Sequence, residues 1–101
     1  MNLCNNKGRS PLWTACLEGY DSTVTLLLNK GADVNSITKN GVTPLYRACR
    51  NGPEITVKVL LHKGADVNLC GNDGDSPLYV ACQNGHESIA QLLLKYGAGM
   101  N

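Results

Sequence analysis

Apolar positions along the chain recur at helical spacing in six short segments. Three of these segments carry small or branched apolar residues at i, i+3 and i+4, which line one face of a helix. They are Leu12/Ala15/Cys16, Leu45/Ala48/Cys49 and Leu78/Ala81/Cys82. Between and after them come Val24/Leu27/Leu28, Val57/Leu60/Leu61 and Ile89/Leu92/Leu93. The pattern predicts three pairs of short helices.

Capping residues bound each predicted helix. A hydroxyl residue and a proline precede every first helix, as Ser10-Pro11, Thr43-Pro44 and Ser76-Pro77. The hydroxyl can accept a hydrogen bond from a free N–H at the helix start, and proline suits the first helical position, where no N–H is needed. Glycines at one phase supply the left-handed residue that ends these helices. They are Gly19, Gly52 and Gly85.

The second helices are expected to begin near an acidic residue and to end before a glycine. The acidic residues are Asp21, Glu54 and Glu87. A carboxylate at the positive end of a helix dipole stabilises it by about 0.3–1 kcal/mol, so these side chains are interpreted as capping charges and not as catalytic ones. The closing glycines are Gly31, Gly64 and Gly97.

The entire pattern repeats every 33 positions, as from Ser10 to Thr43 to Ser76. Such a period indicates an array of stacked units that bury a core only together. Lys7-Gly8, Asn40-Gly41 and Asp73-Gly74 share one phase. The last two dipeptides suit a tight hairpin turn, so a short β-hairpin finger is expected in each unit. One array is expected over 1–101, with repeats at about 5–37, 38–70 and 71–101 and residues 1–4 as the tail of a preceding repeat.

Each unit contains Gly-x-Thr/Ser-Pro-Leu-x-x-Ala, then Gly, and the first two units end in Leu-Leu-x-x-Gly-Ala-Asp-Val-Asn. This motif resembles the ankyrin repeat. The resemblance implies an all-α ankyrin-repeat solenoid of paired antiparallel helices with short β-hairpin fingers, which binds other proteins through its concave face. Where the family usually has His after Pro-Leu, this chain has Trp13, Tyr46 and Tyr79. We expect these aromatic residues to be partly buried between finger and helix.

Composition narrows the possible functions. A net charge of +1 gives no sign of a nucleic-acid or membrane partner, and no apolar run approaches a membrane span. A cytoplasmic or nuclear location is therefore expected. The five cysteines follow the repeat phase, which favours packing over disulfides, and no zinc motif accompanies them. Cys4 and Cys70 are expected to be the more exposed thiols. No metal, cofactor or catalytic motif is found, so an enzyme is not expected.

Residues that vary between units at the same phase are candidates for the binding surface. By the resemblance, a partner meets the finger tips and the exposed face of the first helix. The candidates are Lys7, Arg9, Leu17, Lys39, Asn40, Val42, Arg47, Arg50, Asp73, Asp75, Val80 and Gln83. The first two units are basic here and the third finger is acidic. We expect this polarity to orient a partner protein, with Arg47 and Arg50 as the principal contacts because they lie one helical turn apart.

Two alternatives accompany this hypothesis. In the first, the charged face is only solvated surface and a partner binds elsewhere on the protein. In the second, the chain is a structural spacer in a longer array. The resemblance further implies possible asparaginyl hydroxylation at Asn35 and Asn68, although an Asn side chain there can instead bond to neighbouring loop backbone. Because the last unit keeps apolar residues on its second helix, a monomer or weak end-to-end self-association is expected.

Overall fold

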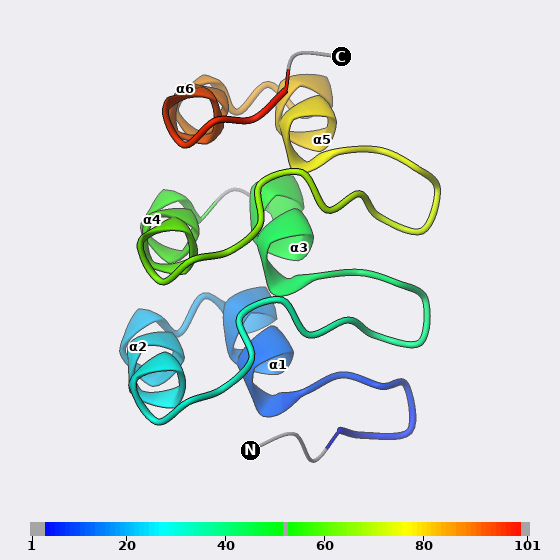
Figure 1. Ribbon diagram of the computed structural model, residues 1–101, viewed down its shortest axis with the longest axis vertical. Helices are drawn as coiled ribbons and strands as arrows, with labels where there is room; N and C mark the ends of the chain where they lie inside the picture. The colour runs from blue at the N-terminus through cyan, green and yellow to red at the C-terminus, as the bar shows by residue number, and fades with distance from the viewer. Residues whose placement is uncertain (1–3, 52, 100–101) are drawn as a thin grey trace.

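The computed structural model describes residues 4–51 and 53–99, and within them the chain forms helices and turns but no strands. The helices are α1 (Pro11–Glu18), α2 (Asp21–Asn29), α3 (Pro44–Asn51), α4 (Glu54–His62), α5 (Pro77–Gln83) and α6 (Glu87–Lys95). Figure 1 shows three stacked layers, each an antiparallel helix pair with a loop projecting to one side. Helices α1, α3 and α5 form the column nearest the loops, and α2, α4 and α6 form the outer column. The predicted solenoid is confirmed.

The first helices begin at the predicted prolines, and the predicted hydroxyls cap them. The N–H groups of Trp13, Tyr46 and Tyr79 each donate to the capping oxygen three residues earlier, over 3.0 Å. Gly19, with φ of 74°, ends α1, and its N–H donates to the Ala15 and Cys16 carbonyls. Gly52 lies outside the described residues, as does most of the expected tail at 1–4.

The second helices also have the predicted ends. Each begins at its acidic residue, and each of Gly31, Gly64 and Gly97 follows its helix with a φ between 92° and 94°. Asp21 has a second role beside the capping charge that the sequence predicts. Its Oδ1 accepts a hydrogen bond of 2.6 Å from the hydroxyl of the buried Thr56 in α4, so this carboxylate also joins the first layer to the second.

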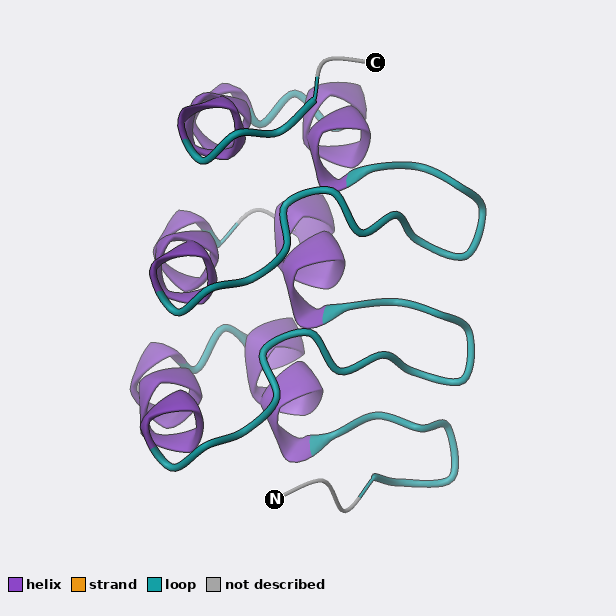
Figure 2. Ribbon diagram, viewed as in Figure 1, coloured by secondary structure: helices purple, strands orange, loops and turns teal. Residues whose placement is uncertain are grey.

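The expected β-hairpin fingers are wrong in detail, because the fingers are turns without strands (Figure 2). In the finger at 38–42, the Thr38 N–H donates to the Val42 carbonyl over 3.1 Å, and the Gly41 N–H donates to the Thr38 carbonyl over 2.9 Å. The fingers at 5–9 and 71–75 repeat these two bonds. Glycine alone takes a positive φ in the described chain, so Asn40 does not form the primed turn that the dipeptide favours. These two hydrogen bonds close each finger loop but do not form the ladder of a β-hairpin.

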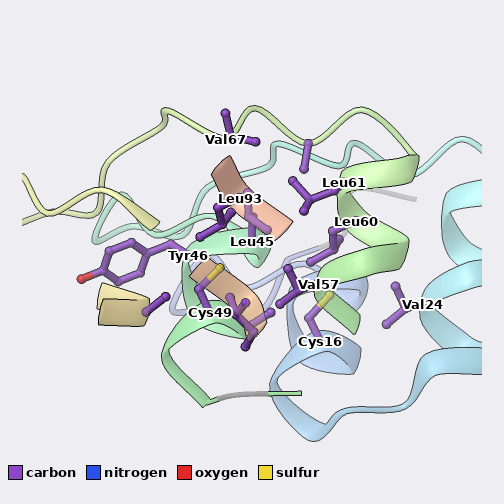
Figure 3. Packing of buried hydrophobic residues seen from close by; sticks show 14 of the residues in the cluster. Cys16, Val24, Leu45, Tyr46, Cys49, Val57, Leu60, Leu61, Val67 and Leu93 are labelled. Carbon is purple, nitrogen blue, oxygen red and sulfur yellow. The ribbon is translucent and has the colours of Figure 1, made fainter. Parts of the chain in front are cut away.

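The core lies between the two helix columns and continues from layer to layer. Figure 3 shows Leu45, Cys49, Val57 and Leu60 close together between α3 and α4, each at most 1% exposed. Burying one such leucine side chain contributes about 1.5–3 kcal/mol relative to leaving it in water. Cys16 and Cys49 are fully buried, which agrees with a packing role. Cys82 shares their phase but is exposed, because no described layer lies over α5.

Candidate functional site

A pocket of about 340 Å³ lies where the three fingers meet α1 and α3. We call it the finger pocket. Its lining residues are Lys7, Arg9, Trp13, Thr38, Asn40, Val42, Tyr46, Arg47, Arg50, Asn72 and Asp73. Segments more than sixty positions apart in the sequence thus share one wall, because the 33-residue step superimposes equivalent positions. Most of the predicted partner-binding residues are among them.

The remaining predicted residues lie elsewhere. Lys39 is exposed on the second finger, Asp75 is half-buried on the third, and Leu17 and Gln83 lie on α1 and α5 outside the pocket. The expected exposure of Val80 is wrong, since this side chain is 3% exposed and belongs to the core. Arg47 occupies the same phase in α3 but is only half-buried. The aliphatic stem of Arg47 packs where the Val80 side chain packs in the next repeat, and its guanidinium extends beyond this position.

Three guanidinium groups converge on the finger pocket. Arg9 lies over the Trp13 ring, 4.5 Å from its centroid, which is a cation–π contact. Burial lowers the pKa of Arg47, and the neighbouring charges of Arg50 and Arg9 lower it further. Within residues 4–51 and 53–99 the only ion pair joins Lys58 to Glu54 in α4. The cations of the pocket therefore have no anionic partner within 4 Å in the described chain.

The third finger supplies the opposite charge to the same pocket. Asp73 lines the pocket, and its Oδ1 accepts a hydrogen bond of 3.3 Å from the Asp75 N–H. Burial raises the pKa of Tyr46, the charges of Asp73 and Asp75 raise it further, and the charge of Arg50 opposes this rise. A Cβ on Gly71 would lie 2.7 Å from the Tyr46 ring. The sequence did not single out Gly71, whose lack of a side chain lets the finger pack on that ring.

The aromatic residues at the phase of Trp13 differ in burial. Trp13 and Tyr46 are 4% and 6% exposed, whereas Tyr79 is 52% exposed. The expected burial is confirmed for the first two and is wrong for Tyr79, over which no described finger lies. Trp13 Nε1 is the only buried side-chain nitrogen or oxygen without a hydrogen-bond partner in the described part of the chain. An unpaired buried donor of this kind costs about 1–3 kcal/mol.

Asn35 and Asn68 form hydrogen bonds between successive repeats. Asn35 Oδ1 accepts from the Asp66 N–H over 2.9 Å, and Asn68 Oδ1 accepts from the Gly99 N–H over 3.1 Å. The sequence predicts that each asparagine bonds to neighbouring loop backbone. In the structure, this backbone belongs to the loop of the next repeat. Hydroxylation of either residue stays a prediction.

The geometry agrees with the comparison with known families. A family model described as ankyrin repeats, in three copies, matches residues 1–70 and 36–101. The chain belongs to the ankyrin-repeat family. The comparison with curated proteins returned no match. Ankyrin repeats generally mediate protein–protein interactions and are typically non-catalytic.

Two structural findings bear on other functions. Among the described residues, no helix is both long and apolar enough to cross a membrane. The same residues contain no group of three or more His, Cys, Asp or Glu side chains placed to hold a metal ion.

Proposed function

We propose that this chain is a non-catalytic interaction module that binds a partner protein through its fingers and the concave face of its first helices. The observation that carries the proposal is the finger pocket, where Arg9, Arg47 and Arg50 lie close together and have no anionic partner within 4 Å among residues 4–51 and 53–99. Arginine, tryptophan and tyrosine are enriched at protein-binding hot spots.

The charge distribution supports a fixed orientation of the partner. Lys7, Arg9, Arg47 and Arg50 place positive charge on the first two repeats, and Asp73 places negative charge on the third, all within one pocket. A partner segment of complementary polarity associates faster and in one register. Its acidic part lies against the first two repeats in this proposal.

Capture of partner proteins from a cell lysate tests the proposal. The native chain is compared with Arg47→Glu/Arg50→Glu, after circular dichroism has shown equal helix content. The matched control is Lys30→Glu/Lys95→Glu, which makes the same charge change at two exposed lysines outside the finger pocket. We expect a protein that the native chain and the control both retain and the arginine variant loses.

A structural spacer is the alternative function. Its support is the stacking itself, since hydrogen bonds such as Asn35 to Asp66 connect the repeats whether or not a partner binds. If the arginine variant and the native chain retain the same proteins, or neither retains any, the interaction proposal fails and the spacer role is favoured.

A further inference from the structure

We propose that the finger pocket is a carboxylate-binding site that takes one acidic side chain of a partner protein. The inference rests on the proposed function and specifies its chemistry. Arg9, Arg47 and Arg50 bind the carboxylate, and the indole Nε1–H of Trp13 donates a further hydrogen bond. Asp73 marks the side of the pocket from which additional acidic residues are repelled.

The arginines provide the first argument. Arg47 is half-buried between Arg50 and Arg9, so three positive charges repel one another at the pocket without compensation from a described carboxylate within 4 Å. An entering anion removes this repulsion. A guanidinium matches the planar fork of a carboxylate with two parallel hydrogen bonds.

Trp13 provides an independent argument. It lines the pocket, is 96% buried, and its Nε1 has no acceptor in the described chain. An indole can only donate. The Arg9 guanidinium lies over the indole ring, 4.5 Å from its centroid, so a carboxylate that pairs with Arg9 lies close to Trp13. Because Nε1 is buried, its neighbours must shift before it donates to that carboxylate.

Asp73 limits the amount of negative charge that a partner can place in the pocket. Asp73 lines the same 340 Å³ volume and carries a negative charge close to Tyr46. A partner segment with a second acidic residue near the third finger is repelled by Asp73. One Glu or Asp side chain therefore fits better, followed by a neutral or basic residue toward the third finger.

The chain contains its own reporter for this site. Trp13 is the only tryptophan, so its indole N–H gives a single side-chain signal in a ¹H–¹⁵N correlation spectrum. The ¹⁵N-labelled chain is titrated with a capped tetraglutamate peptide, a capped tetraglutamine peptide and inorganic phosphate. We expect tetraglutamate alone to move the indole signal to saturation at low salt. An equal response to tetraglutamine or to phosphate would overturn the carboxylate assignment.

Variants separate binding from folding. Arg47→Gln/Arg50→Gln should weaken tetraglutamate binding about tenfold or more. Lys30→Gln/Lys95→Gln, with the same loss of charge, should change it little. Asp73→Asn should strengthen it, which a variant that merely loosens the fold would not do. Retained affinity in the arginine variant, or weaker binding by Asp73→Asn with well-dispersed backbone signals, would overturn the site.

Trp13→Phe removes the Nε1–H and leaves a smaller aromatic ring at this position. Backbone amide signals of Arg47 and Arg50 follow the titration in this variant, and a severalfold weaker affinity is expected. Unchanged affinity removes Trp13 from the site. If lysate capture depends on Arg47 and Arg50 while tetraglutamate leaves the indole signal in place, the carboxylate site fails and the interaction function stands. If the indole signal responds to tetraglutamate and no protein is captured from the lysate, the carboxylate site stands and the interaction function fails.

Discussion

The buried thiols of Cys16 and Cys49 show how strongly single residues depend on the stack. Burial raises the pKa of each from 9.0 to about 12, and for Cys16 the charge of Asp21 adds to the effect. Because the folded pKa lies above the unfolded one, the stabilisation from these neutral thiols is fully present below pH 9. It is lost progressively as the pH rises from about 9 to 12.

Thiol labelling at pH 8 tests this residue-scale difference. We expect Ellman's reagent to react quickly with the exposed Cys4, Cys70 and Cys82 and to reach Cys16 and Cys49 only after unfolding in denaturant. Cys82→Ser should remove one fast equivalent and leave both slow ones. Fast labelling of Cys16 or Cys49 in the native chain would show that the layers open much more readily than this packing indicates.

At the scale of the element, the N-caps are chemically alike but differ in their surroundings. Ser10 is 4% exposed, and its Oγ lies 3.2 Å from Ser36 Oγ as well as accepting from the Trp13 N–H. Ser76 is half-buried, and the Tyr79 N–H is the only hydrogen-bond partner of its side chain in the described chain. The Ser10 cap therefore also connects α1 to the loop between α2 and α3, where Ser36 lies.

Alanine substitutions should separate these two roles. Ser76→Ala is expected to lower the free energy of unfolding by about 1 kcal/mol through loss of the cap. Ser10→Ala should lower it by about 2 kcal/mol, because Ser36 also loses its partner. The measurement is urea unfolding followed by circular dichroism. Ser22→Ala, at an exposed position of α2, serves as the control and should change the value by less than about 0.5 kcal/mol. Equal losses at Ser10 and Ser76 would assign no stabilisation to the Ser36 contact.

At the scale of the whole molecule, the middle layer is the only described one with neighbours on both sides. Helix α3 packs against α1 and α5, and α4 packs against α2 and α6. The third layer leaves Tyr79 and Cys82 exposed at positions whose equivalents in α3 are buried. Stability in a solenoid is a sum of repeat and interface terms, so the outer layers should open more readily. The expected monomer or weak end-to-end association stays a prediction.

Native-state hydrogen exchange measures this gradient. We expect the backbone amides of Cys49 and Leu60 to exchange most slowly, and those of Cys82 and Leu93 in the third layer to exchange at least about tenfold faster. Equal protection in all three layers would contradict the gradient and show that the array unfolds as one cooperative unit.

The fold could be predicted because its signals are local and recur. Ser10 and Gly19 each act on backbone groups within about four residues, so the ends of α1 follow from the sequence alone. The predicted end at Gly85 is displaced, because α5 ends at Gln83 and Asn84 is its C-cap. The proximity of Arg47 to Arg9 was harder to predict from the sequence, because it depends on how the layers superimpose equivalent positions. The unpaired Nε1 of Trp13 leaves no sequence signal, since hydrogen bonding there depends on atoms from several segments.

The sequence by itself determined the six helices, their caps, the 33-residue step and the family to which they belong. The tertiary structure alone decided which equivalent positions are covered. Cys49 is buried and Cys82 exposed, and Arg47 is half-buried where Val80 is buried. Capping and turn chemistry are settled within a few residues of backbone, whereas exposure and charge pairing depend on whether another layer lies over a side chain and on what that layer carries.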